Sequence, residues 1–189
     1  MTSTQSTALA ALLEEAETGM TNSQRWAWVR GLYEAHREGL ARFLVELGSE
    51  PSTVDDLVSE TFIRAFEVAA HYELRSSEST WLFGIALNVA RNQRAKEQRH
   101  RFLRRLFLRP ERAGPGTSAE VEARSQLSAV LRAVRALPPV LREAYVVRVL
   151  EQQPLKEAAA LLSVPISTVA ERAARAEALV FAAIAKEEA

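Results

Sequence analysis

The chain has 189 residues, of which 48% are hydrophobic, and its 24 basic and 24 acidic residues give a formal net charge of zero. This composition suits one ordinary folded domain or two small ones, and it excludes an intrinsically disordered chain. The lack of cysteine excludes disulfides, thiolate nucleophiles and cysteine-based zinc sites.

Residues 1–24 are predicted to be a loosely held extension with one short helix around Leu9–Glu17. They lack a basic start and carry three glutamates where a signal peptide would approach its cleavage site. No run in the sequence approaches the roughly 20 consecutive apolar residues that span a bilayer. We therefore expect a cytoplasmic protein without membrane insertion.

Three helices are predicted in the first half of the chain. The first covers residues 25–47 and is ended by Gly48 and Pro51, the second runs from Ser52 or Thr53 to about residue 70, and the third begins near Trp81 after a loop over residues 72–80. The first helix repeats apolar residues mostly three or four positions apart: Trp28, Leu32, Leu40, Phe43, Leu44 and Leu47.

The third predicted helix enters a basic belt. Residues 1–80 have a net charge of −7, whereas residues 81–112 have a net charge of +7. Such segregation is typical of a polyanion contact confined to one stretch. Charge alone leaves nucleic-acid binding and a solvated helix end about equally open.

The basic helix has two faces. Its core face is predicted to hold Leu82, Ile85, Ala86 and Val89. Its open face is predicted to hold Trp81, Asn88, Arg91 and Asn92, continuing into Arg94, with Tyr72 and His71 across the loop. An aromatic ring among amides and cations suits single-stranded nucleic acid, because bases stack on the ring while cations contact phosphates. The alternative is that Trp81 is a buried core residue.

The stretch from Pro110 to Glu120 is rich in proline and glycine and predicts a flexible linker. Beyond it, helices are predicted over residues 121–136, 139–151, 154–162 and 167–186. The expected fold is all-α, with two small helical domains at residues 25–107 and 125–189, joined by a linker at residues 108–124. The second domain ends in a helix-turn-helix pattern.

In this pattern, Ser163, Val164 and Pro165 form the predicted turn. The expected buried residues are Leu155, Ala158, Ala159 and Leu162 in the first helix, and Ile166, Val169, Ala173 and Ala176 in the second. Thr168 and Glu171 have the spacing of a capping box at the start of the second helix. Its open face would carry residues that suit the major groove: Ser167, Thr168, Glu171, Arg172 and Arg175. An ordinary helical hairpin is the alternative.

Taken together, the chain resembles the extracytoplasmic-function (ECF) sigma factors of RNA polymerase. The resemblance rests on three segments in this order around the linker: DDLVSETFIRAF (55–66), WLFGIALNVARNQ (81–93) and ALPPVLREAYVVRVLEQQPLKEAAALLSVPISTVAERAARA (136–176). It implies promoter-specific transcription initiation without catalytic residues, metals or cofactors.

The resemblance implies that the helix containing Asp55 docks on core RNA polymerase, at the clamp helices of its largest subunit, with a further contact at the flap. The implied polymerase contacts are Asp55, Asp56, Glu60 and Arg64, beside the core residues Leu57, Phe62 and Phe66. For Asp55 and Asp56, helix capping and compensation of the helix dipole remain open as well.

The resemblance also implies that the first domain captures flipped bases of the single-stranded −10 promoter element. The implied residues are Tyr72, Trp81, Asn88, Arg91, Asn92 and Arg94. The open face of the helix-turn-helix, from Ser167 to Arg175, would read the −35 duplex. An anti-sigma factor is implied as a further partner.

Two departures from the family pattern motivate alternatives. Ala170 stands where a basic residue is frequent, and Ser79-Thr80 replaces an aromatic–basic pair. They leave open a sigma-like interaction protein that binds regulators without promoter opening. A stand-alone helix-turn-helix regulator is a further alternative, which would explain the second domain but not the first. An enzyme is not expected, because the three histidines are scattered and no phosphate-binding glycine loop is present.

Overall fold

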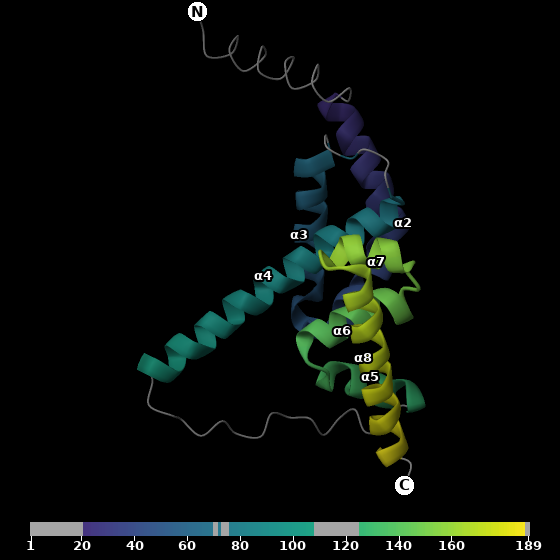
Figure 1. Cartoon of the computed structure of the whole chain (residues 1–189). Coiled ribbons are helices and arrows are strands. Elements are labelled where there is room, and N and C mark those ends of the chain that lie inside the picture. The colour runs from purple at the N-terminus through teal and green to yellow at the C-terminus, as the bar shows by residue number, and fades with distance from the viewer. Residues whose placement is uncertain (1–20, 70–71, 73–75, 108–124, 188–189) are drawn as a thin grey trace, which may run out of the picture.

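The computed structural model describes residues 21–69, 72, 76–107 and 125–187, and the elements in these ranges are all helical (Figure 1). This confirms the predicted all-α class. The predicted short helix around Leu9–Glu17 and the linker from Pro110 to Glu120 lie outside the described residues. The elements are α2 (Asn22–Glu46), α3 (Pro51–Val68), α4 (Glu78–Phe107), α5 (Ser125–Ala136), α6 (Pro139–Tyr145), the π-helical segment η2 (Val146–Leu150), α7 (Leu155–Leu162) and α8 (Ile166–Glu187).

Local signals fix both ends of α2. Thr21 and Gln24 form a capping box, with the Gln24 N–H donating to the Thr21 hydroxyl at 3.2 Å and the Thr21 N–H donating to Oε1 of Gln24 at 2.7 Å. After α2, Gly48 adopts a left-handed φ of 90°, which glycine accepts without steric cost. Pro51 then occupies the first position of α3, where its missing N–H needs no partner.

Helix α4 begins at Glu78, three residues before the predicted start at Trp81. The Ser77 hydroxyl accepts a hydrogen bond from the Thr80 N–H at 3.1 Å, and the Trp81 N–H donates to the Ser77 carbonyl at 3.0 Å. Ser77 therefore acts as a cap that the sequence pattern did not reveal. As a result, Trp81 is already in the first turn of the helix.

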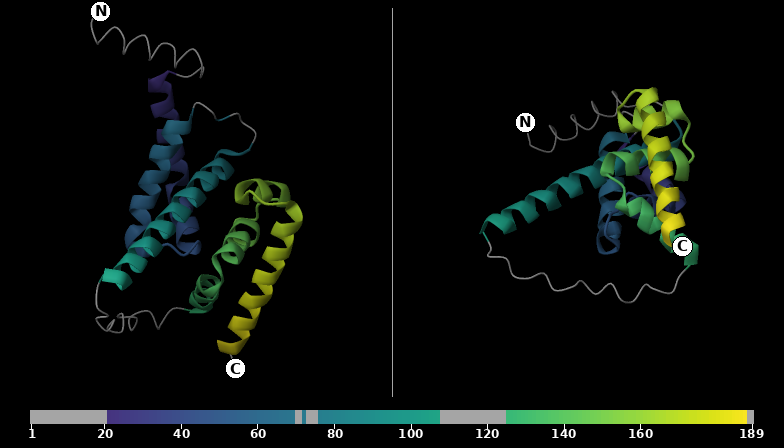
Figure 2. Two further views of the ribbon diagram at one scale, coloured as in Figure 1. Left: turned by 60° about the vertical axis from the view of Figure 1, so that its left-hand side comes forward. Right: turned by 60° about the horizontal axis from the view of Figure 1, so that its bottom comes forward.

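The described residues from 21 to 107 form the first half of the molecule, and those from 125 to 187 form the second. Helix α4 is the element of the first half that packs against the second (Figure 2). On one side it packs against α2 and α3, and on the other it contacts α7 of the second half. Buried residues of both halves form one continuous core, which includes Phe43 and Leu82 from the first half and Val146 and Val169 from the second. The C-terminal half of α4 extends away from this body.

The helix-turn-helix consists of α7 and α8. Ser163 ends α7 in a left-handed conformation with φ of 57°, and the Val164 N–H donates to the Ala159 carbonyl at 3.1 Å. Helix α8 then begins at Ile166, so that Thr168 is its third residue and the predicted capping box is wrong. Ile166 is 49% exposed, which also contradicts its predicted burial, because it lies in the first turn.

The predicted helix over residues 139–151 is divided in the structure. Helix α6 ends at Tyr145 and continues as the π-helical segment η2, after which Gln152 adopts a positive φ of 51°. This sharp change of direction brings Gln153 to α4, where the Thr80 hydroxyl donates to its Oε1 at 3.0 Å.

None of the helices in the described ranges combines the length and apolar character that a bilayer crossing requires.

Candidate nucleic-acid interface

Three aromatic rings form a cluster at the start of α4. The ring centroid of Tyr72 lies 4.9 Å from that of Trp81 and 5.3 Å from that of Trp28, and the two tryptophan rings are 5.4 Å apart. The Trp28 indole N–H donates to Glu78 Oε1 at 2.9 Å, and the Tyr72 hydroxyl donates to the Ser76 carbonyl at 2.7 Å. These bonds hold the cluster at one edge of the first half.

Trp81 is neither fully exposed nor fully buried in this cluster. Trp81, Tyr72 and Trp28 are each half-buried, so that each ring is supported by protein and still has accessible surface. Burial, together with the Glu78 carboxylate, raises the pKa of Tyr72 above its ordinary value of 10.0 and keeps its hydroxyl protonated. Such a supported aromatic surface can stack on unpaired bases.

Trp28 is a member of this cluster that the sequence pattern assigned only to the apolar face of the first helix. It lies on α2, far along the chain from Trp81 on α4, and the contact arises because the two helices pack together. Periodicity within one helix carries no signal for such a pairing. The bulky aromatic character of Trp28 was the only available hint.

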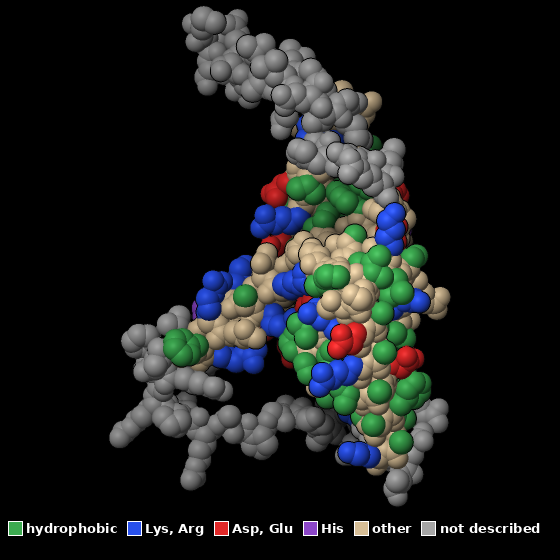
Figure 3. All heavy atoms as spheres, viewed as in Figure 1, with side chains coloured by type: hydrophobic (Ala, Val, Ile, Leu, Met, Phe, Trp, Pro, Cys, Tyr) green, Lys and Arg blue, Asp and Glu red, His purple; other side chains and the backbone are tan. Residues whose placement is uncertain are grey.

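The two predicted faces of α4 are confirmed for most of their residues. Leu82, Ala86 and Val89 are buried, whereas Asn88 and Asn92 are exposed. Beyond them, basic side chains gather along the extended half of the helix (Figure 3). The exposed residues that contribute to this basic surface are Lys96, Arg99 and Arg101.

Arg91 and Arg94, however, are only partly exposed, and both are bonded to the second half of the chain. Both hold Glu143 of α6, whose side chain is only 8% exposed. Arg91 donates to Glu143 Oε2 through Nη2 at 2.8 Å and through Nε at 3.2 Å, and Arg94 donates to Oε1 at 3.2 Å. The predicted DNA-facing arginines are therefore joined to the second half of the chain.

A second polar contact joins the halves at the end of α2. The Leu47 carbonyl accepts a hydrogen bond from Arg142 of the second half at 3.1 Å, and it also accepts one at 3.0 Å from Arg94, which belongs to the same half as Leu47. Arg142 also donates to the carbonyls of Val134 and Arg135 in the last turn of α5 and to that of Leu137, just after this helix. Burial, followed by the neighbouring Arg94 and Arg135, lowers the pKa of Arg142 below its ordinary value.

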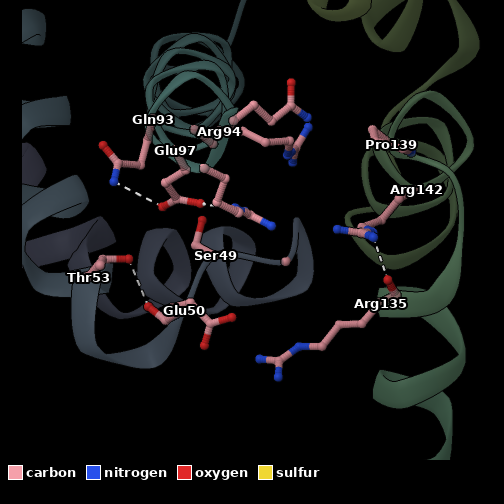
Figure 4. A pocket seen from close by; sticks show the side chains of 13 residues that line it. Ser49, Glu50, Thr53, Gln93, Arg94, Glu97, Arg135, Pro139 and Arg142 are labelled. Carbon is pink, nitrogen blue, oxygen red and sulfur yellow. Dashed lines mark hydrogen bonds and ion pairs between the residues drawn. The ribbon is translucent and has the colours of Figure 1, made fainter. Parts of the chain in front are cut away.

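A pocket of about 370 Å³ opens beside these contacts (Figure 4). It lies between the turn after α2, the middle of α4 and the start of α6, and its labelled side chains come from both halves. Arg94, Glu97, Arg135 and Arg142 are among its lining residues. The junction of the two halves is thus charged and incompletely packed at this point.

The open face of α8 agrees with the predicted arrangement for several residues. Ser167, Glu171 and Arg175 are exposed, while Thr168 and Arg172 are half-buried. Opposite them, Val169, Ala173 and Ala176 are buried. Within residues 125–187, neither Arg172 nor Arg175 has an ion-pair partner, so both cations can meet an external polyanion.

Helix α3 presents the predicted protein-binding residues on its solvent side. Asp55, Asp56 and Arg64 are exposed, and Arg64 forms loose ion pairs of 3.6 Å with Glu60 and Glu67. Because α3 begins at Pro51, both aspartates lie beyond its first turn. The proposed alternative of helix capping by Asp55 or Asp56 is therefore wrong, which leaves their carboxylates available for contact.

The remaining core predictions for α3 hold in part. Leu57 and Phe62 are buried, whereas Phe66 is half-buried and packs on the exposed Trp26 with ring centroids 4.4 Å apart.

Within the described ranges, no group of three or more histidine, aspartate or glutamate side chains is arranged to hold a metal ion.

Comparison with known families gives two matches. The model of Sigma-70 region 2 matches residues 32–100, and that of Sigma-70, region 4 matches residues 127–180. The first match contains Tyr72 and Trp81 of the aromatic cluster, together with Lys96 and Arg99 of the basic surface of α4. The second contains α7 and most of α8.

Two curated relatives extend over most of the chain. The ECF RNA polymerase sigma factor SigC of Mycobacterium tuberculosis (strain CDC 1551 / Oshkosh) is 32% identical over 144 residues, which cover 76% of each chain. The RNA polymerase sigma factor NccH of Alcaligenes xylosoxydans xylosoxydans is 30% identical over 151 residues, which cover 78% of this chain and 81% of the relative.

Among solved structures, the chain shares its fold with the sigma factor RpoE from Bartonella quintana, which was crystallised in complex with the anti-sigma factor NepR. The TM-score is 0.67 at 22% sequence identity, and the match covers 82% of this chain and 95% of the other.

Proposed function

The chain belongs to the ECF sigma factors of RNA polymerase. From this premise, we propose which of its residues contact polymerase and which contact promoter DNA. As a sigma factor, the protein directs promoter-specific transcription initiation and is not an enzyme. Separate surfaces of the chain contact polymerase, single-stranded promoter DNA and duplex promoter DNA.

Residues 25–107 act as the domain that opens the promoter and reads the −10 element. The observation that carries this assignment is the packing of Tyr72 against Trp81, with ring centroids 4.9 Å apart, on the helix that also exposes Asn88 and Asn92. Flipped bases stack on the rings while the amides accept and donate hydrogen bonds at base edges. Arg91 and Arg94 contact phosphates of the same strand.

Helix α3 docks on the clamp helices of the largest polymerase subunit. Its contacts are the exposed Asp55, Asp56 and Arg64, with Glu60 beside them. The loose 3.6 Å ion pairs of Arg64 support this role, because exposed ion pairs contribute little stability and exchange partners readily.

Residues 125–189 act as the domain that reads the −35 duplex and contacts the polymerase flap, and residues 108–124 link it to the first domain. Helix α8 enters the major groove with Ser167 and Glu171 directed at bases and Arg175 at the backbone, flanked by Thr168 and Arg172. The exposure of Ser167, Glu171 and Arg175 supports this assignment.

An anti-sigma factor is the proposed regulatory partner. The support is the fold shared with RpoE, whose structure was solved in complex with the anti-sigma factor NepR. Because core polymerase and promoter DNA are its other partners, we assign the protein to the cytoplasm.

The test adds the purified chain to core polymerase, maps transcript starts, and detects unpaired thymines with permanganate. We expect Asn88→Ala to reduce opening several-fold through the loss of about 1 kcal/mol of hydrogen bonding, with unchanged polymerase binding. Gln98→Ala is the matched control, because Gln98 is an exposed amide further along α4.

Failure to form a holoenzyme would overturn the whole proposal. Polymerase binding without promoter opening would instead favour a sigma-like interaction protein. Sequence-specific duplex binding without polymerase would favour a stand-alone regulator.

A further inference from the structure

Glu143 is a buried carboxylate that accepts hydrogen bonds from two arginines of the other domain. Its side chain is 8% exposed and accepts two hydrogen bonds from Arg91 and one from Arg94. Both arginines are on α4, whereas Glu143 is on α6, 52 and 49 residues further along the chain. The carboxylate is thus the centre of a charged contact between the domains.

The donors in this contact are ones that a DNA phosphate could also use. A guanidinium presents parallel N–H donors that fit a carboxylate and a phosphate equally well. Both the Nε and the Nη2 donor of Arg91 are already hydrogen-bonded to a single oxygen of Glu143. The same donors cannot bind Glu143 and the phosphates of a −10 strand at once.

The rest of the junction is of a kind that can separate. Besides apolar residues of the continuous core, such as Leu161 where it approaches Gly84, it contains the Thr80–Gln153 hydrogen bond at 3.0 Å and the Arg142 hydrogen bond to the Leu47 carbonyl at 3.1 Å. The charged pocket beside it is open to solvent. Interfaces between domains of one chain permit relative motion unless they are large and hydrophobic, and this one includes a charged, solvent-open part.

The two DNA-reading surfaces are affected differently by this contact. Arg91 and Arg94 are occupied, while Ser167, Glu171 and Arg175 of α8 stay exposed in the same arrangement. The contact therefore masks the phosphate-binding arginines of the first domain and leaves the recognition helix of the second accessible.

We propose that Glu143 is an internal competitor of promoter DNA: it holds the helix-turn-helix domain against α4 in the free protein and leaves Arg91 and Arg94 when the −10 strand binds. This inference rests on the proposed function, in which Arg91 and Arg94 contact DNA. It adds a closed state of the free chain and the residue that maintains it.

The first measurement follows the distance between the domains in the full chain. Because the chain has no cysteine, Ser59→Cys on α3 and Ala182→Cys on α8 provide two exposed spin-label sites without background. Double electron–electron resonance should give one narrow distance distribution for the otherwise unaltered chain. Glu143→Ala should broaden it and shift it to longer distances, and Glu143→Gln should have a smaller effect.

The second measurement is the affinity of the free chain for a random-sequence single-stranded oligonucleotide. Glu143→Ala should bind it roughly tenfold more tightly, because a larger fraction of the protein is competent to bind. Glu177→Ala is the charge-matched control, since Glu177 is an exposed carboxylate on α8, and it should change both measurements little. Circular dichroism and urea titration verify that each variant folds.

Unchanged distances in folded Glu143→Ala and Glu143→Gln would overturn the closed state. Wider distances with unchanged oligonucleotide affinity would overturn the competition with DNA. In that case, Arg91→Ala combined with Arg94→Ala in the holoenzyme locates the failure: normal promoter opening by this variant means that the proposed role of the arginines is itself wrong.

Discussion

Gly48 and Arg142 meet where the two domains join, and each restricts the other. Gly48 has φ of 90°, and a Cβ atom built on it would lie 2.1 Å from Nη1 of Arg142. The guanidinium has little freedom to retreat, because it is bonded to the carbonyls of Leu47, Val134 and Leu137. The absence of a side chain at position 48 is therefore needed both for the turn and for the domain contact.

We predict that Gly48→Ala lowers the free energy of unfolding by roughly 2–3 kcal/mol, from the strained φ and the displaced guanidinium. The urea midpoint of the full chain measures this loss. Gly31→Ala is the control: Gly31 lies inside α2, and a Cβ added there would have no atom within 4 Å, so alanine should stabilise the protein by about 0.5–1 kcal/mol. Equal effects of the two substitutions would contradict the prediction.

The exposure of some residues could be predicted from the sequence, whereas contacts between distant residues could not. Asn88 and Asn92 were correctly placed on the exposed face of α4, because the periodicity of one helix determines its faces. The partner of Arg91 was not predicted, since Glu143 lies 52 residues away and on another domain. A pattern along one helix contains no information about which distant side chain will cover it.

At the scale of single helices, α8 has one buried and one open face, and its two ends differ in surroundings. Arg175 lies in the half of α8 that is proposed to read DNA, and Lys186 lies in the last turn. Both are exposed cations on the same helix. They therefore allow a comparison in which the lost charge is the same and only the position changes.

We expect Arg175→Ala to reduce the salt dependence of −35 duplex binding by the holoenzyme by about one unit of slope, because one phosphate contact is lost. Fluorescence anisotropy over a series of salt concentrations measures the slope. Lys186→Ala should leave it unchanged. The same reduction in both variants would indicate a general charge effect and contradict a specific contact by Arg175.

The helices themselves were largely predictable, while their first residues were not. Apolar spacing identified α2, α3, α4, α7 and α8. The Thr168–Glu171 pattern misplaced the start of α8, because the same spacing also fits the interior of a helix that begins at Ile166. Ser77 was overlooked as the cap of α4, since it has threonine rather than glutamate three residues later.

At the scale of the whole molecule, two carboxylates interact across the domain junction. Glu46, the last residue of α2, has a buried Oε2 without a hydrogen-bond partner among the described residues. Burial and the neighbouring Glu151 raise the pKa of Glu46 to about 7, although Arg42 opposes this shift. Burial also raises the pKa of Glu151. The folded arrangement therefore holds a proton on Glu46 that the unfolded chain releases.

This shift predicts that stability falls as the pH rises. The ordinary pKa of Glu46 is 4.5, so its penalty begins above that value and is complete once the pH passes about 7. Glu46→Gln should lose less stability than the unaltered chain between pH 5 and pH 8 in urea titrations. Glu38→Gln, an exposed carboxyl on the same helix, should keep the full pH dependence, and a similar flattening in this control would contradict the prediction.

The division of the chain into two helical parts followed from composition and linker signals, but their packing on each other did not. The continuous core and the contacts of Glu143 and Leu47 join segments whose sequence patterns are each complete on their own. Sequence patterns describe the two parts separately. The free energy of their association depends on a few side chains that meet only in three dimensions.

The cluster of Trp28, Tyr72 and Trp81 also gives the protein a built-in optical signal. The protein has three tryptophans, and two of them, Trp28 and Trp81, lie in this cluster. Their ring centroids are 5.4 Å apart, which is close enough for their electronic transitions to couple. A base that stacks on Trp81 would alter this coupling and the indole emission at the moment of strand capture. Near-ultraviolet circular dichroism and intrinsic fluorescence can therefore follow the kinetics of promoter opening without an attached dye.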